Sequence, residues 1–139
     1  MPKIETCGMA VVMCGGKVLT ISEMVFGRQV LSLPKGHQEK GEDIIDTAIR
    51  ECFEETNIRL DKYQLICGLT PYSYEFTSPG NTFIRKTVHP FLFKVPGEGN
   101  PKATEKTMVS VDWMNTDEFL AKCTYDSVKA AVAEAMTRL

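Results

Sequence analysis

The sequence lacks the features that mark membrane-spanning, secreted and disordered chains. None of its apolar runs approaches the roughly 20 residues that span a bilayer, and Met1 to Glu5 lacks the basic and apolar regions of a signal peptide. Its 43% hydrophobic and 24% charged residues fall in the ordinary globular range, which excludes low-complexity and disordered classes. We therefore expect a cytoplasmic protein without membrane association, folded as a single domain over residues 1–139.

Paired cysteines are also missing. The five cysteines form no CxxC motif and are odd in number. This arrangement argues against both a disulfide framework and a zinc ribbon. Most of these cysteines are expected to pack as small hydrophobic side chains.

A strong net charge of either sign is absent as well. Sixteen basic and 18 acidic residues leave a net charge of −2, which is too balanced for a protein that binds nucleic acid stably. The distribution is uneven, because the segment from Lys35 to Ile58 holds seven acidic residues and only three basic ones. The negative charge is therefore concentrated in one part of the chain.

The first third of the chain is typical of short strands. Thr6 to Cys14 and Lys17 to Glu23 are apolar, strand-like runs on either side of Gly15-Gly16, which predicts a hairpin with a two-glycine turn. Val30 to Leu33 is predicted as a further short strand, stopped by Pro34 and followed by a loop that continues to Glu42.

The remaining pattern mixes strands and helices. Pro90 lies awkwardly in one strand-like run and suggests an edge position or a bulge there. Together the elements indicate an α+β arrangement with helices layered on a sheet. The predicted elements are a helix over Asp43 to Thr56 closed by Asn57, a long hairpin formed by Tyr63 to Phe76 and Thr82 to Val95, a strand over Met108 to Trp113, a short helix capped by Asn115 or Thr116 and running to Leu120, and a final helix from Asp126 or Ser127 to Leu139.

The helix predicted over 43–56 gathers carboxylates on one side. At about 100° per residue, Glu51, Glu54 and Glu55 share one arc, away from the apolar stripe that can face a sheet. Carboxylates at this spacing repel one another by a few tenths of a kcal/mol per pair. Hard oxygen ligands on one face suit Mg²⁺ or Mn²⁺. A solvated acidic helix face is the alternative interpretation of these three residues alone.

A wider spacing pattern decides between the two interpretations. Five residues separate Gly36 from Glu42, seven more lead to Arg50, and Arg50-Glu51-Cys52-Phe53-Glu54-Glu55-Thr56-Asn57-Ile58 follows without a break. This pattern resembles the Nudix box, G-x5-E-x7-R-E-U-x-E-E-x-G-U, in which U is a bulky apolar residue. The similarity covers Gly36, Glu42, Arg50, Glu51, Glu54, Glu55 and Ile58.

Two positions depart from the box. Asn57 replaces the final glycine of the family pattern, and Cys52 stands where an aliphatic residue is usual. Asparagine is the next best residue at a left-handed helix end, and cysteine packs as a small hydrophobe. Neither departure removes a metal ligand.

The resemblance implies the fold and the activity of Nudix hydrolases. The implied fold is an α/β/α sandwich with a mixed sheet between helices. The implied reaction is the metal-dependent cleavage of a pyrophosphate bond in a nucleoside diphosphate linked to another group, with Mg²⁺ or Mn²⁺ as the cofactor. A small nucleotide is therefore the expected partner, and the chain is expected to be a monomer or a homodimer.

The resemblance also assigns roles to the residues of the box. Glu51 and Glu55 would be the principal metal ligands, and Glu54 would complete or share the cluster. Glu51 would also help to deprotonate the attacking water. Arg50 belongs to the catalytic set as the arginine that orients a neighbouring glutamate, and Glu42 is its expected partner and structural support.

Further site residues are expected around the box. Gly36 would offer its carbonyl oxygen to the metal, and Glu105 is the candidate for a base or ligand outside the box. Leu33-Pro34-Lys35-Gly36-His37 is similar to the start of the box in diadenosine tetraphosphate hydrolases and their bacterial relatives. Lys35 would contact phosphate, and His37 is a weaker candidate for substrate binding.

Aromatic residues follow in the second hairpin. Tyr72 and Tyr74 alternate along a strand, so both point to one face, where they could stack on a base or pack as ordinary sheet residues. Lys86, on the opposing strand, is a weaker candidate for a phosphate contact.

Two hypotheses follow for the function. The first is a hydrolase that acts on a dinucleoside polyphosphate such as diadenosine tetraphosphate. The alternative is a catalytically idle Nudix-fold module that binds a nucleotide or ADP-ribose as a sensor. The complete set of Glu51, Glu54 and Glu55 favours the enzyme, because a pure binding module does not need it.

Overall fold

The computed structural model describes residues 1–139. It contains eight strands, three α-helices and one short 3-10 helix. In chain order these are β1 (Lys3–Cys14), β2 (Lys17–Val25), β3 (Arg28–Ser32), β4 (Lys35–His37), α1 (Ile44–Thr56), the 3-10 helix (Lys62–Gln64), β5 (Leu65–Gly68), β6 (Tyr72–Thr77), β7 (Phe83–Lys94), β8 (Met108–Asn115), α2 (Thr116–Lys122) and α3 (Asp126–Met136).

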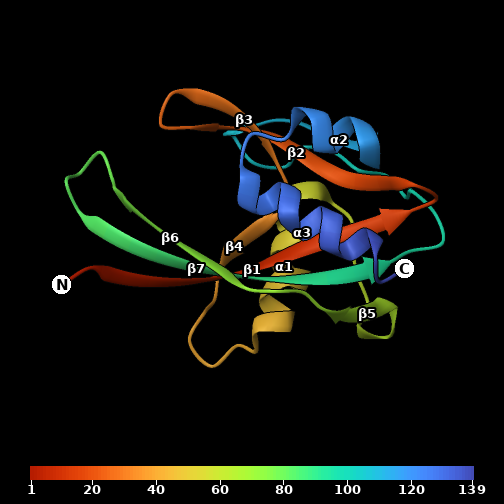
Figure 1. Ribbon diagram of the computed structural model, residues 1–139, viewed down its shortest axis with the longest axis horizontal. Coiled ribbons are helices and arrows are strands. Elements are labelled where there is room, and N and C mark those ends of the chain that lie inside the picture. The colour runs from red at the N-terminus through yellow and green to blue at the C-terminus, as the bar shows by residue number, and fades with distance from the viewer.

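β1 lies at the centre of one mixed sheet. β7 runs parallel to it from Lys3 to Met13, and β4 pairs with it in the antiparallel direction on the other side. β2 pairs with the end of β1 and also carries β3 and β8, while β7 carries β5 and β6 along its outer side. Figure 1 shows the β6–β7 hairpin and the start of β1 extending beyond the helices.

Alternate residues of β1 face two different cores, because successive side chains of a strand point to opposite faces of the sheet. Met9 and Val11 pack in a cluster with Phe119 of α2 and residues of α3. Ala10 and Val12 pack in a second cluster with residues of α1. The sheet is therefore covered by α1 on one face and by α2 and α3 on the other (Figure 1). The predicted α+β sandwich with a mixed sheet between helices is confirmed.

A close approach of backbones fixes α1 on the sheet. A Cβ atom at Gly8 would lie 2.8 Å from both the Ala48 nitrogen and the Ile44 carbonyl oxygen. Such a distance is shorter than van der Waals contact, so only glycine allows β1 to lie this near the helix. The helix that carries the box is thereby held directly against the central strand.

Most of the predicted elements are present, and their ends lie within two to four residues of the predicted ends. The hairpin around Gly15-Gly16 and the helix over the box both form as expected. Asn57 closes α1 in the left-handed conformation, with φ of 67°. Asn115 caps α2 by accepting a hydrogen bond from the Asp117 backbone nitrogen.

Four predictions need correction. The expected loop after Pro34 contains β4, a three-residue strand that exists only through its pairing with β1. The run from Tyr63 to Phe76 is divided into β5 and β6. Pro90 is not at an edge, since it lies within β7 at the point where the outer partner changes from β6 to β5. The final helix ends at Met136 instead of Leu139.

The helices are short. The longest, α1, has 13 residues. None of them combines the length and the apolar character needed to cross a membrane.

Candidate active site

Three carboxylates from two separate segments meet at one end of α1. Glu51 and Glu55 are one turn apart on the helix, and Glu105 comes from the loop that precedes β8. Their ligand oxygens all lie within 4.8 Å of one another. Three hard oxygen donors at this spacing fit a divalent cation of the Mg²⁺ or Mn²⁺ type.

The three carboxylates of this triad differ in exposure, since Glu55 is buried, Glu51 is half-buried and Glu105 is exposed. Glu55 is only 6% exposed, and burial together with the Glu51 charge raises the pKa of its carboxyl group above the usual range. Burial also raises the pKa of Glu105, with a further contribution from the Glu51 charge. A cation among the three oxygens would compensate this crowding of negative charge, so the donor set fits a metal chemically as well as geometrically.

Gly36 leaves the space that Glu51 occupies. A Cβ atom at residue 36 would overlap the Glu51 carboxyl group. The neighbouring Lys35 backbone nitrogen donates a hydrogen bond to Glu55 Oε1 at 3.3 Å. Strand β4 therefore lies directly against the triad, and its glycine is required by contact with the carboxylate.

Arg50 organises the carboxylates beside the triad. Its Nε donates to Glu42 Oε2 at 2.8 Å, and its Nη1 donates to Glu51 Oε1 at 2.7 Å. Its Nη2 donates to the His37 carbonyl oxygen at 2.9 Å, which ties α1 to the end of β4. The hydrogen bonds from Arg50 hold the pKa of Glu42 at about 2. Arg50 thus contacts one member of the triad and the acidic loop before the helix.

Glu54 lies apart from the triad. Its carboxylate accepts from Arg50 Nη1 at 3.0 Å and its side chain is 43% exposed. The three box glutamates therefore do not converge as a set, and the third member of the triad is Glu105 instead. Helical periodicity and the family resemblance both placed Glu54 with the other two, whereas in the structure its carboxylate pairs with Arg50 of the same helix.

The loop that carries Glu105 is fastened to the end of α1. The Lys102 backbone nitrogen donates to the Thr56 carbonyl oxygen at 2.9 Å, and Asn57 Nδ2 donates to the Asn100 carbonyl oxygen at 3.0 Å. The Thr104 hydroxyl donates to the Glu54 carbonyl oxygen. These bonds explain how a residue 50 positions after Glu55 reaches the same site.

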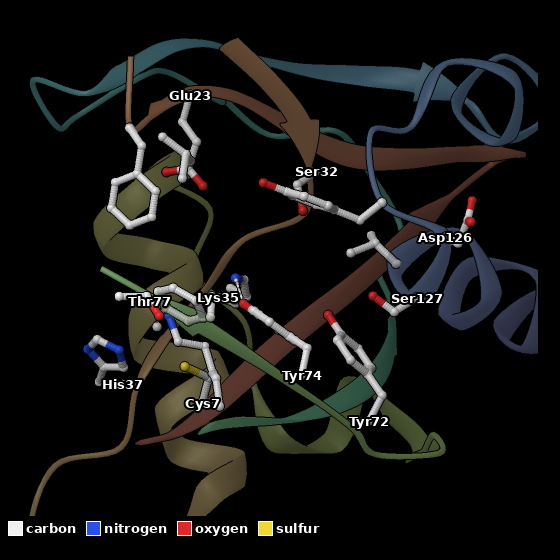
Figure 2. Close-up of a pocket in the computed structure, with 17 residues that line it drawn as sticks. Cys7, Glu23, Ser32, Lys35, His37, Tyr72, Tyr74, Thr77, Asp126 and Ser127 are labelled. Carbon is white, nitrogen blue, oxygen red and sulfur yellow. Dashed lines mark hydrogen bonds between the residues drawn. The ribbon is translucent and has the colours of Figure 1, made fainter. Parts of the chain in front are cut away.

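A cavity of about 820 Å³ adjoins β4. Figure 2 shows Glu23 and Ser32 on one side of it and Tyr72 and Tyr74 on the other. All the residues around the box that the sequence suggested for substrate binding line this cavity, together with the box glycine: Lys35, Gly36, His37, Tyr72, Tyr74 and Lys86.

The aromatic wall of the cavity is longer than the sequence indicated. Tyr72 and Tyr74 are stacked with ring centroids 6.3 Å apart, and Phe76 continues the row at 5.8 Å from Tyr74. Phe26, from the turn between β2 and β3, lies 6.1 Å from Phe76. The alternation of residues along β6 was the signal for Phe76, whereas Phe26 comes from another hairpin and had none.

Two lysines lie along this row of rings. Lys35 Nζ donates to the Tyr74 hydroxyl at 3.4 Å and lies 5.9 Å from the ring centroid. Lys86 Nζ lies 5.5 Å from the Phe76 centroid and 3.6 Å from Glu5 Oε1. His37 Nε2 is also 3.1 Å from Glu5 Oε1. The cavity thus combines flat apolar surfaces with positive charge.

Several polar residues of the cavity were missed, among them Glu23 and Ser32. Glu23 and Ser32 lie on the β2–β3 hairpin, and burial raises the pKa of Glu23. Nothing in the local sequence marks either residue, because only the folding of the hairpin against β6 brings them to the cavity.

Comparison with known proteins agrees with this architecture. The model of the NUDIX domain matches residues 5–135. The putative mutator protein MutT4 of Mycobacterium tuberculosis is 36% identical over 99 residues, which are 71% of this chain and 38% of that protein. The chain therefore spans well under half the length of that relative.

Solved structures share the fold at lower identity. The Ap4A hydrolase of C. elegans, solved as a binary complex, is 21% identical, with a TM-score of 0.77 and 96% of each chain covered. The dihydroneopterin triphosphate pyrophosphohydrolase of E. coli gives the same identity, TM-score and coverage. At this identity the likeness extends to the fold alone. The family model, which covers nearly the whole chain, shows that the protein belongs to the NUDIX family that its box resembles.

Proposed function

We propose that this chain is a pyrophosphohydrolase that cleaves a phosphoanhydride bond of a nucleotide with Mg²⁺ or Mn²⁺. The observation that carries the proposal is the convergence of Glu51, Glu55 and Glu105 beside a cavity lined with aromatic rings and lysines. A carboxylate cluster of this kind repels a polyphosphate unless cations lie between them. The same two features together suit a substrate with a flat base and several phosphates.

The triad residues would supply oxygen ligands, and the Gly36 carbonyl is the candidate for a further one. When bound, the cation would neutralise phosphate charge and increase the nucleophilicity of a water molecule. Glu51 and Glu105 are the candidate bases for that water. In this proposal Glu54 is not a direct metal ligand, because Arg50 holds its carboxylate outside the triad.

Arg50 and Glu42 are positioning residues in this proposal. Two nitrogen atoms of the guanidinium group donate hydrogen bonds to the Glu42 carboxylate, and the third donates to Glu51 Oε1. Fixing Glu51 in one orientation reduces the reorganisation needed when a substrate binds. The oxygen that Arg50 holds and the oxygen left free for a metal are then distinct.

For the substrate we propose a dinucleoside polyphosphate such as diadenosine tetraphosphate. Tyr72 and Tyr74 would stack on one base, and base stacking on such rings contributes about 1–3 kcal/mol per base. Lys35 and Lys86, with His37 nearby, would contact the phosphates beyond the bond that is cleaved. A long polyphosphate supplies those contacts and a nucleotide sugar does not.

A substrate panel tests both the proposed hydrolysis and the proposed substrate. Diadenosine tetraphosphate, ADP-ribose, nucleoside triphosphates and a sugar nucleotide are each incubated with Mg²⁺ and with Mn²⁺, and kcat/KM is measured with chromatographic identification of products. We expect diadenosine tetraphosphate to be preferred. If ADP-ribose or a triphosphate is better by tenfold, the substrate proposal fails and the hydrolase proposal stands. Tight binding without turnover of any compound would support the sensor alternative.

A further inference from the structure

Ser32 is the one buried side chain with an unpaired polar atom. Its hydroxyl has no hydrogen-bond partner although the residue is only 2% exposed. Other buried hydroxyl groups are paired, as Thr20 is with the Asp112 carbonyl oxygen at 3.0 Å and Thr56 with the Cys52 carbonyl oxygen at 2.6 Å. Leaving a buried hydroxyl unpaired costs free energy, so its retention needs a reason. Ser32 lines the cavity, where a ligand could supply the missing partner.

Glu23 lies on the same face of the β2–β3 hairpin as Ser32. Ser32 is directly opposite Ile21 in the antiparallel pair, and Glu23 is two residues beyond Ile21 on β2. Directly opposed residues share a face, as do residues two apart on one strand. The carboxylate and the hydroxyl therefore form a diagonal pair on one side of the cavity.

The row of rings forms the opposite side. Figure 2 shows Tyr72 and Tyr74 across the cavity from Glu23 and Ser32. The contact between Phe26 and Phe76 joins the hairpin to the end of the row. A flat heterocycle bound between the row and the hairpin would therefore lie beside the polar pair.

We propose that Ser32 and Glu23 form a ring-recognition wall that selects a nitrogen heterocycle with an amino group on its edge. This rests on the proposed function, since it identifies what the aromatic row holds. An ionised carboxylate only accepts hydrogen bonds, so Glu23 requires a donor from the ring, whereas the Ser32 hydroxyl can donate or accept. A ring without a donor on that edge would leave the Glu23 carboxylate desolvated and without a hydrogen-bond partner. Sites of this kind discriminate strongly against analogues that lack the hydrogen-bonding group.

Binding without metal tests this wall separately from hydrolysis. Dissociation constants are measured by NMR titration in EDTA for two pairs of nucleoside 5′-monophosphates that differ by one amino group. The pairs are AMP with purine riboside monophosphate, and GMP with IMP. In at least one pair we expect loss of the amino group to weaken binding about tenfold.

Two variants should remove this discrimination. Ser32→Ala and Glu23→Met should each bring the ratio of the two dissociation constants to about threefold or less. Ser32→Ala should also leave the melting temperature unchanged or higher, because it removes an unpaired buried hydroxyl. A hydroxyl with a purely structural role would lower it. The control is Thr20→Val on the same hairpin, which should lower the melting temperature and keep the tenfold ratio.

The results separate this inference from the proposed function. A ratio below twofold in both pairs, or an unchanged ratio in both variants, overturns the ring-recognition wall even if the protein hydrolyses diadenosine tetraphosphate. A ratio that is present in the parent and lost in the variants supports the wall even if no substrate is turned over, in which case only the proposed hydrolysis fails.

Discussion

Single carboxylates on α1 have separable roles that matched substitutions can reveal. Glu51→Gln keeps the size of a triad residue and removes its charge, so turnover in saturating Mg²⁺ should fall by at least about a hundredfold, a barrier change of roughly 3 kcal/mol. Glu54→Gln removes the same charge from the same helix outside the triad and should cost less than about tenfold. Kinetics with circular dichroism as a folding check measures both. Equal losses in the two variants would contradict the separation of Glu54 from the metal site.

Tyr74 offers a test of the proposed stacking between the substrate base and the row of rings. Tyr74→Ala removes the central ring of the row and should raise KM more than it lowers kcat, because stacking away from the reacting phosphorus is similar in the ground and transition states. Tyr63→Ala is the matched control, since that ring is exposed and lies outside the cavity. Steady-state kinetics should show no change for the control. A drop in kcat alone for Tyr74→Ala would speak against stacking.

Residues within the box were predictable, and residues brought in by the fold were not. The spacing from Gly36 to Ile58 identified the helix that carries Glu51 and Glu55, because seven positions are constrained at once. Glu105 was found as a candidate only through the resemblance. Glu23, Ser32 and Phe26 carry no local signal, because their positions depend on the packing of one hairpin against another.

At the scale of elements, the end of α1 links the helix to the loop of Glu105. Asn57→Gly keeps a residue suited to the left-handed conformation and removes the bond from Nδ2 to the Asn100 carbonyl oxygen. We expect stability to change by less than about 1 kcal/mol and the dissociation constant for Mn²⁺ to rise several-fold, since the third carboxylate becomes less well fixed. Calorimetric titration measures the affinity, and denaturant unfolding measures the stability.

Asn57→Ala separates the two contributions of this residue. Alanine loses the same side-chain bond and also disfavours the left-handed conformation, so it should destabilise the fold by about 1 kcal/mol more than glycine does. An unchanged Mn²⁺ affinity in Asn57→Gly would mean that the Lys102 and Thr104 bonds hold the loop without help.

Elements set by local pattern were predicted well, and elements set by distant pairing were not. The helix over the box has both an apolar period and a clear end at Asn57. By contrast, β4 has three residues and depends on β1 for every hydrogen bond of its ladder. The division between β5 and β6 falls opposite Pro90, which only the alignment with β7 reveals.

For the whole molecule, metal binding should be linked to folding stability. The triad joins α1 to the loop before β8, and its carboxylates are assembled only in the folded chain. A cation at about 100 times its dissociation constant adds about 2.7 kcal/mol, which corresponds to a rise in melting temperature of roughly 5–10 °C for a chain of this size. Thermal melts in EDTA and in Mg²⁺ measure the shift. Glu51→Gln should lose most of it, and an equal shift in that variant would place the metal elsewhere.

The mixed sheet itself was predictable only as a class. A run of strands and helices indicated layers, but the parallel pairing of β1 with β7 joins segments about 80 residues apart. Nothing in either segment specifies the other as a partner. The family resemblance supplied the sandwich that the pattern alone left open.

The alternation along β1 constrains the number of residues that this strand can have. Since neighbouring residues serve opposite cores, inserting or deleting one residue before Gly8 would exchange the two sets of side chains and put a bulky one where the helix backbone leaves no room. A change of two residues restores the alternation but displaces the register with β7. Length changes in related chains should therefore accumulate in the turns that flank this strand, while the strand itself varies only by substitution.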